Sequence, residues 1–229
     1  MQAIILAAGK GTRMGSLTET LPKPMLPING KTLLEHKFDQ LPAVIDEIII
    51  VIGYLGDVIK ERYGNEYNST KITYMEQTEL NGTGGALLLL QPILNERFMI
   101  LMGDDIYARE DMENCIATEG WSLLLEDMEH MAAGGKMIVN DKGEVVGIEE
   151  GNHRGTPGLF NTNLAVLDRR IFDFPPVPKN EGSAEFGLPH HMVQASLAGN
   201  IPIHAVMTTF WIQITAPEDL ERASTLMGS

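Results

Sequence analysis

Glycines and cations follow directly after an apolar run near the start of the chain. Residues 3–8 are apolar, Gly9, Gly11 and Arg13 come next, and Lys23 stands between two prolines shortly afterwards. Glycine lets backbone N–H groups approach a ligand closely, and consecutive N–H donors suit phosphate oxygens. Fixed cations beside such a loop would neutralise a polyphosphate. The stretch therefore predicts a site for a nucleotide or a similar phosphorylated ligand.

The charge distribution favours a small anion over a nucleic acid as the ligand. The 229 residues carry a net charge of −14, whereas binding to nucleic acid requires a basic surface. Residues 1–31 are an exception, because cations outnumber acids there: Lys10, Arg13, Lys23 and Lys31 against Glu19. A local basic island in an acidic protein suits a compact anionic ligand.

The two common phosphate-binding loops do not fit this stretch. A dinucleotide-binding fingerprint requires a third glycine where Met14 stands, which argues against a dehydrogenase. A Walker A loop that ends in Gly30-Lys31-Thr32 would require a glycine where Met25 stands. We therefore interpret Gly30 and Lys31 as a plain turn.

The composition is that of a globular protein, with 44% hydrophobic and 21% charged residues. No apolar run reaches the roughly 18 residues of a membrane span, and no basic-then-apolar leader opens the chain. The single cysteine, Cys115, cannot form an internal disulfide and is interpreted as a small core residue. We expect a cytoplasmic protein without a membrane or nucleic-acid partner.

Strands and helices are expected to alternate through the first half of the chain. Apolar runs predict strands at 2–7, 47–52, 71–75 and 98–102, and helical spacing predicts helices at 32–41, 57–63 and 83–94. This alternation predicts an α/β fold with a mostly parallel central sheet covered on both faces. Ligands of such sheets lie beyond the carboxyl ends of the strands, where Gly9, Gln77 and Asp104 stand.

The second half is expected to be richer in β-structure. Strands are predicted at 121–125, 136–139, 144–148, 163–167 and 203–207, with a hairpin turn at 140–143. A helix is expected around 188–197, and a last helix is expected to begin at Pro217. No segment is poor enough in apolar residues to separate independent domains, so we expect one domain over residues 1–229.

The motif Leu-Ala-Ala-Gly-x-Gly-Thr-Arg-Met, followed by Pro-Lys-Pro-Met-Leu-Pro-Ile, resembles the opening of the sugar-1-phosphate nucleotidyltransferases (nucleotide-sugar pyrophosphorylases). The resemblance continues, in family order, through 77–87, 103–107, 146–150, 161–163 and 211–220. It is to glucose-1-phosphate thymidylyltransferases, mannose-1-phosphate guanylyltransferases and uridylyltransferases. It implies a Rossmann-like sheet with a β-rich sugar-binding lobe, and an Mg²⁺-dependent reaction of an NTP with a sugar 1-phosphate.

The resemblance also implies a role for individual residues. Arg13 and Lys23 would contact phosphates, and Asp104 would bind Mg²⁺, with Gln213 as a second ligand. The other residues implied to bind the nucleotide lie in the glycine loop and in the 82–83 segment: Leu6, Ala8, Gly9, Gly11, Thr12, Gly82 and Thr83. The residues implied to bind the sugar phosphate are Gly135, Glu150 and Asn161. Asp105 remains the alternative to Asp104, and Glu149 the alternative to Glu150.

Gln77 would read the edge of the base, with help from Gly82. A primary amide offers a donor and an acceptor together, which suits an imide or amide edge. The spacing from Gln77 to Gly82 resembles uridylyl- and thymidylyltransferases and favours UTP or dTTP, although residues 82–87 also resemble guanylyltransferases. His190 and His191 lack a third ligand at metal-site spacing and are interpreted as helix residues.

Three positions depart from the family pattern. Gln213 stands where many members have aspartate, Asn163 where Asn-Thr-Gly ends in glycine, and Gly151 where a lysine follows the glutamate. Lys136 and Lys179 are the candidate replacements for that lysine. The departures motivate one alternative, a nucleotide-sugar-binding protein with impaired catalysis. A second alternative is a cytidylyltransferase that acts on a phospho-alcohol such as phosphocholine.

The expected division of the domain places nucleotide binding in about residues 1–110 and sugar binding in about 111–229. The β-helix acyltransferase domain that is fused to some family members is not expected after the last helix. A homo-oligomer is compatible with the sequence.

Overall fold

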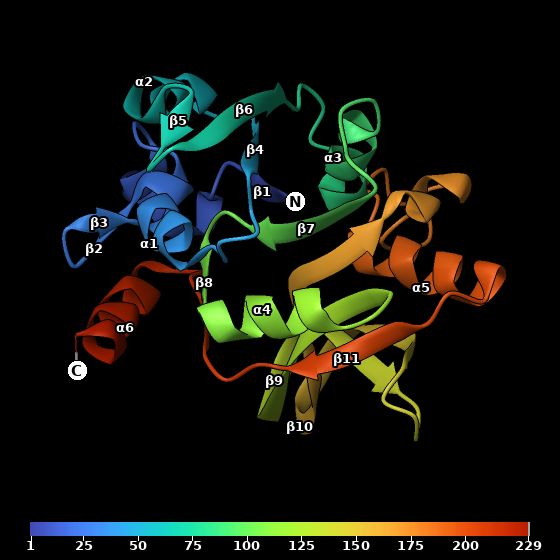
Figure 1. The fold of residues 1–229 in the computed structure, drawn as a ribbon. Helices are drawn as coiled ribbons and strands as arrows, with labels where there is room; N and C mark the ends of the chain where they lie inside the picture. The colour runs from blue at the N-terminus through green and yellow to red at the C-terminus, as the bar shows by residue number, and fades with distance from the viewer. Residues whose placement is uncertain (229) are drawn as a thin grey trace.

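A mixed eight-stranded sheet forms the centre of the protein (Figure 1). The structure is a computed structural model that describes residues 1–228, apart from the side chain at position 132. The strand order is β11-β9-β10-β7-β1-β4-β6-β5. The bounds are Gln2–Ala7 for β1, Glu47–Ile52 for β4, Glu66–Tyr67 for β5, Thr70–Glu76 for β6, Arg97–Met102 for β7, Trp121–Val139 for β9, Val145–Asp168 for β10 and Ile203–Met207 for β11.

The pairing confirms the expected α/β fold with a mostly parallel sheet. Strands β7, β1, β4 and β6 are parallel neighbours, and β11 is parallel to β9. Among the described residues, the antiparallel pairs of this sheet are β10 with β7, β10 with β9, and the short β5 with β6. Ile4 of β1 lies between Ile49 and Ile100. All residues of β1 are buried, as suits a continuous apolar run at the centre of a parallel sheet.

Helices cover both faces of the sheet. Ile4 and Leu6 pack into a cluster with α3 (Gly82–Leu90) and α5 (Leu188–Gly199), whereas Ala3 and Ile5 face the opposite cluster. That cluster holds α1 (Leu33–Gln40), α2 (Gly56–Tyr63) and α4 (Arg109–Ala117). The sequence pattern does not predict α4, which buries only Asp111, Met112 and Cys115. No helix of the described residues is both long and apolar enough to cross a membrane.

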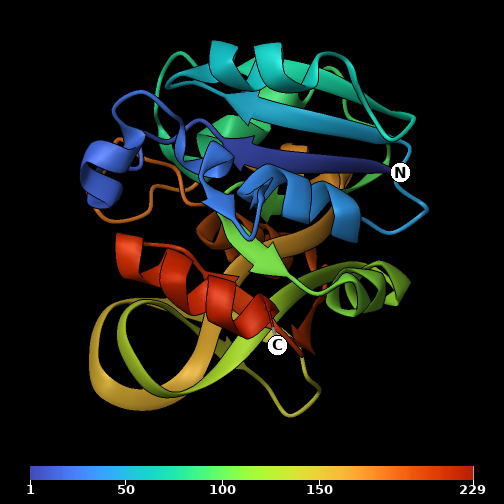
Figure 2. The ribbon, with the colours of Figure 1, turned by 90° about the vertical axis from the view of Figure 1, so that its left-hand side faces the viewer.

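Strands β9 and β10 differ from the expectation of several short strands. Each is continuous, and the two pair along most of their length with repeated shifts in register. Glycines and polar residues in their middle sections interrupt the alternating pattern, so the pattern alone predicts separate strands. The prediction is wrong because pairing between the two strands continues through these sections. The paired ribbon curves away from the central sheet at the bottom of Figure 2.

The end of the chain returns to its beginning. β12 (Trp211–Gln213) pairs with β8 (Asp105–Tyr107), and α6 (Pro217–Met227) packs beside β2 (Pro27–Ile28). A third core cluster joins Met14 and Ile28 to Ile212, Ile214 and Ala223. The hairpin of β2 with β3 (Lys31–Thr32) turns through Asn29 and Gly30, both with positive φ, so the predicted turn lies one residue earlier than expected and Lys31 already belongs to a strand.

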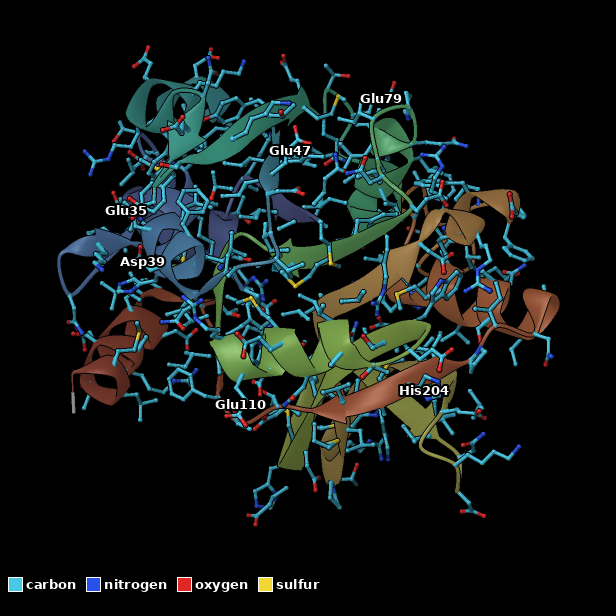
Figure 3. All side chains as sticks on the ribbon, in the orientation of Figure 1. Glu35, Asp39, Glu47, Glu79, Glu110 and His204 are labelled. Atoms are coloured by element: carbon cyan, nitrogen blue, oxygen red, sulfur yellow. The ribbon has the colours of Figure 1, made fainter. Side chains whose placement is uncertain are left out.

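Glu47 connects three strands at the amino end of the parallel sheet (Figure 3). Its carboxylate accepts hydrogen bonds from Gln2 of β1 and from Lys71 and Thr73 of β6, each at 2.7 Å. The polar cavities lie at the opposite end of the sheet, beyond the carboxyl ends of β1 and β7.

Candidate functional site

Two adjoining cavities open at the carboxyl ends of the central strands. Their volumes are about 480 Å³ and about 220 Å³. Arg13, Lys23 and Asp104 line both of them, together with Met102 and Thr215. Two separate motifs, the glycine loop and the Asp104 turn, therefore meet at the boundary between the cavities.

The smaller cavity is lined by the glycine loop. Leu6, Gly9, Gly11 and Thr12, four of the residues expected to contact a nucleotide, lie here. Gly82 and Thr83 line the larger cavity instead. Ala8 and Gln77 line neither cavity and are buried.

Local hydrogen bonds and one buried anchor shape the loop. Gly11 has a φ of +63°, a conformation that favours glycine. Its carbonyl accepts from the backbone N–H of Met14 at 2.9 Å and from the Thr18 hydroxyl at 3.1 Å. Met14, which breaks the dinucleotide-binding fingerprint, is only 1% exposed and anchors the loop in the core. Arg13 beside it is exposed and makes no hydrogen bond or ion pair with the described residues, so its guanidinium is available to a ligand.

Lys23 is a buried cation at the boundary of the cavities. Its ammonium donates to Oδ2 of Asp104 at 2.5 Å and to the carbonyl of Ile214. The side chain is 7% exposed, against 25% for Asp104. The fold therefore holds one cation and one carboxylate together where a phosphorylated ligand would bridge the two cavities.

Asp105 has a structural environment that differs from that of Asp104. Its carboxylate is buried and accepts from the indole N–H of Trp211 at 3.1 Å, and burial raises its pKa to about 8. The buried Lys37 donates to its carbonyl. Asp105 lines only the larger cavity and is 2% exposed, whereas Asp104 lines both cavities and its side chain is 25% exposed, so Asp104 is the more available of the two as a metal ligand.

The larger cavity brings the expected acceptor residues together. Gly135 and Glu150 are partners in the β9–β10 register and line the cavity with Asn161. Glu149, the alternative to Glu150, is exposed and does not line it. The residues expected to bind the sugar phosphate therefore line one cavity together with Lys23.

Asn163 occupies the place of the family glycine without straining the backbone. Its φ is +60°, in the left-handed region that asparagine tolerates better than most other side chains. Its N–H donates to Oδ1 of Asn161 at 2.9 Å, and its Oδ1 accepts from Nδ2 of Asn161 at 3.0 Å. The substitution therefore adds a side chain that orients the amide of Asn161.

The family model for nucleotidyl transferases matches residues 2–172, and these residues contain both the glycine loop and the Asp104 turn. The chain belongs to the nucleotidyl transferase family. UTP–glucose-1-phosphate uridylyltransferase AglF of Haloferax volcanii is 31% identical to this nucleotidyltransferase over 97% of the chain and 95% of its own length. D-glycero-α-D-manno-heptose 1-phosphate guanylyltransferase of Campylobacter jejuni is 30% identical over 96% of each chain.

Other similarities are partial or concern the fold. The bifunctional protein GlmU of Methanocaldococcus jannaschii is 27% identical over 98% of this nucleotidyltransferase, which spans 53% of GlmU. The structure of the inositol-1-phosphate CTP transferase from T. maritima matches with a TM-score of 0.78 at 20% identity, over 99% of this chain and 94% of that one. At this identity the match shows a shared fold.

The residues at the boundary of the cavities fit a divalent metal ion, which the nucleotidyl transferase family generally uses. Gln213 of β12 lies opposite Asp105 in the β8–β12 register and lines the larger cavity with Asp104. A carboxylate and an amide oxygen are hard ligands of the kind that Mg²⁺ prefers, with phosphate oxygens and water completing its shell. The described residues contain no cluster of three or more His, Cys, Asp or Glu side chains suited to hold a metal ion.

The structure adds His190 to the larger cavity of this nucleotidyltransferase, and Lys179, one of the two candidate cations, lines the cavity as well. His190 lies on α5, as expected of a helix residue, and its Nε2 is 3.8 Å from Oε1 of Glu150. Burial lowers the pKa of this imidazole. Of the two candidate replacements for the family lysine, Lys179 lines the cavity and Lys136 does not. No sequence motif marks His190 or Lys179, because tertiary packing alone brings them to the β9–β10 ribbon.

Proposed function

We propose that this chain transfers a nucleotidyl group from an NTP, with UTP or dTTP favoured, to a sugar 1-phosphate, and that it requires Mg²⁺. The observation that carries the proposal is the pair of adjoining cavities that share Arg13, Lys23 and Asp104. One cavity offers glycine N–H groups for a nucleotide, and the other offers carboxylate and amide groups for sugar hydroxyls. The activities in the names of the uridylyl- and guanylyltransferase relatives support this assignment.

In the proposed reaction, a phosphate oxygen of the sugar 1-phosphate attacks the α-phosphorus of the NTP. A new P–O bond forms while the bond to the β-phosphate oxygen breaks, and pyrophosphate leaves. The attacking oxygen is already anionic at neutral pH, so the step requires no general base. Arg13 and Lys23 align the phosphates and stabilise the charge that moves onto the leaving group. Mg²⁺ held by Asp104 and Gln213 would supply further neutralisation of phosphate charge.

The remaining roles follow the two sides of the site. Gln77 and Gly82 are proposed to read the base, and Glu150 and Asn161 to bind the sugar. Further contacts to the nucleotide are proposed for Leu6, Ala8, Gly9, Gly11, Thr12 and Thr83. A further contact to the sugar phosphate is proposed for Gly135. We propose one domain, with residues 1–110 mainly for the nucleotide and 111–229 mainly for the sugar, in a cytoplasmic protein.

The test is pyrophosphate release across a panel of NTPs and sugar 1-phosphates with Mg²⁺. Release that depends on both substrates and on the metal supports the proposal. Nucleotide-sugar binding without release would instead support the binding protein of impaired catalysis. Release restricted to CTP with phosphocholine would support the cytidylyltransferase.

A further inference from the structure

The protein itself uses both hydrogens of the Gln77 side-chain amide. Nε2 donates to Oδ1 of Asn81 at 3.0 Å and to the carbonyl of Gly82 at 3.2 Å. A primary amide has two donor hydrogens on nitrogen and an acceptor on oxygen. Only Oε1 therefore remains to Gln77 for a ligand, and Oε1 accepts hydrogen bonds without donating any.

This oxygen is available although Gln77 is only 6% exposed. None of the described residues donates a hydrogen bond to Oε1. Solvent can reach this oxygen, because it is absent from the set of fully buried polar atoms without a partner. The adjacent Gly82 lines the larger cavity. A base that approaches this segment would thus meet an acceptor of fixed orientation.

Gly85 leaves free the space that the Asn81 side chain occupies when it accepts the hydrogen bond from Gln77. Asn81 precedes α3, and its side chain reaches back over Gly85 in the first turn of this helix. A Cβ atom at position 85 would lie 1.8 Å from Oδ1 of Asn81 and 2.3 Å from its Cγ, so this arrangement requires glycine. The carbonyl of Asn81 separately accepts from the N–H of Phe186 at 2.8 Å. The backbone of Asn81 is therefore anchored independently of its side chain.

We propose that Asn81 is a specificity-determining residue, which turns the Gln77 oxygen toward the base and thereby selects bases with a ring N–H. This inference rests on the proposed function. Uracil and thymine present N3–H on the Watson–Crick edge, and guanine presents N1–H; each can donate to Oε1. The corresponding ring nitrogens of cytosine and adenine carry a lone pair, which would face the lone pairs of Oε1. Asn81 thus favours UTP, dTTP or GTP over CTP and ATP.

Three variants test the role of Asn81. Asn81→Ala removes the acceptor that holds Nε2, and Gly85→Ala displaces the Asn81 side chain without changing it. The control Asn81→Asp keeps an oxygen acceptor for Nε2 in nearly the same shape. Dissociation constants for UTP, dTTP, GTP, CTP and ATP are measured for each full-length protein with Mg²⁺, and thermal unfolding shows which variants are folded.

The wild type and Asn81→Asp are expected to bind the best ring-N–H nucleotide roughly tenfold or more tighter than CTP and ATP. Asn81→Ala and Gly85→Ala are expected to lose most of this preference, because only the longer hydrogen bond to the Gly82 carbonyl, at 3.2 Å, then holds the Gln77 amide. A wild type that prefers CTP or ATP would overturn the inference, as would an unchanged preference in a folded Asn81→Ala. Pyrophosphate release is measured in parallel and tests only the proposed function. The binding preference is independent of it, because the preference can be present or absent whether or not the nucleotidyl group is transferred.

Discussion

Lys23 donates from Nζ to Oδ2 of Asp104 at 2.5 Å, across the boundary between the two cavities. These are the cation proposed to contact phosphate and the carboxylate proposed to bind metal. Each neutralises the other in the protein without ligands, so neither charge is left unpaired at a largely buried position. In the proposed complex, each group would receive a new partner of opposite charge when a metal ion and a phosphorylated ligand bind together. The pairing of Lys23 with Asp104 therefore predicts joint binding of the metal and the nucleotide.

Lys23→Ala is expected to retain the fold and to lower turnover by roughly 100- to 1000-fold. The variant lacks a preorganised cation where charge develops on the leaving pyrophosphate, and losses of this size are typical of such groups. The measurement is the steady-state rate of pyrophosphate release, with circular dichroism to verify folding. Lys142→Ala removes an exposed lysine at the hairpin turn and is the matched control. Turnover of Lys23→Ala at the wild-type rate would rule out this role.

Asp104→Asn is expected to raise the Mg²⁺ concentration for half-maximal activity at least tenfold. An amide keeps the shape of the side chain but loses the negative charge that attracts the cation, and even outer-sphere losses typically cost about 10- to 100-fold in metal affinity. A titration of activity against Mg²⁺ at fixed substrate concentrations measures the change. Glu149→Gln removes an exposed carboxylate near the larger cavity and serves as the control. An unchanged titration for Asp104→Asn would count against it as a ligand.

The sequence predicts the central part of the fold and much of the site, because local signals determine both. The apolar run of β1 and the residues after it are adjacent in the chain, so the glycine loop is predicted together with its strand. The expected placement of Asp104 and Gln77 after strands is likewise a consequence of strand order.

Features that depend on distant segments could not be predicted in this way. Lys179 and His190 reach the larger cavity because their segment docks on the 81–84 turn: Phe186 donates to the carbonyl of Asn81 at 2.8 Å and accepts from the N–H of Gly84 at 2.9 Å. No pattern within residues 175–190 indicates this partner. The continuity of β9 and β10 is missed for the same reason, because it arises from their mutual pairing across the glycine-rich middle sections.

Asn163→Gly is expected to raise the KM for the sugar 1-phosphate roughly 2- to 10-fold and to leave the KM for the NTP unchanged. Glycine adopts the φ of +60° without strain, but it removes the Oδ1 that orients Nδ2 of Asn161 at 3.0 Å. Initial rates at varied concentrations of each substrate separate the two constants. Asn163→Ala removes the same contact but strains the backbone, so it is expected to unfold at a lower temperature than Asn163→Gly. Equal effects on both KM values would indicate a general structural role instead.

Lys37→Met is expected to lower the free energy of unfolding by about 1–3 kcal/mol, the usual cost of leaving a buried hydrogen-bond partner unsatisfied. Lys37 is 2% exposed, it donates to the carbonyl of Asp105, and its ammonium lies 5.5 Å from the centre of the Tyr107 ring. Burial lowers the pKa of Lys37 to about 8. The double variant Lys37→Met/Asp105→Asn keeps the main-chain carbonyl of position 105 without its donor, so it is expected to regain little of this loss. Urea unfolding of the single and double variants measures both losses, and a double variant restored to the stability of the wild type would show that the Asp105 side chain, and not its carbonyl, is the partner of Lys37.

Glu47 is expected to stabilise the fold at neutral pH and to lose this effect in acid. Burial raises the pKa of Glu47, but hydrogen bonds from Gln2, Lys71 and Thr73 outweigh burial and hold the pKa below its usual value of 4.5. A depressed pKa in the folded state gives stability that is fully present above the usual pKa and is lost as the pH falls through the folded value. The difference in unfolding free energy between the wild type and Glu47→Gln should therefore be largest near pH 6–7 and shrink below about pH 4.

Urea unfolding from pH 7 to pH 3 measures this difference in free energy. The control Glu119→Gln reports the general effect of removing one exposed carboxylate from this acidic chain. A difference that stays constant or grows as the pH falls would mean that the ionised Glu47 is not the stabilising form.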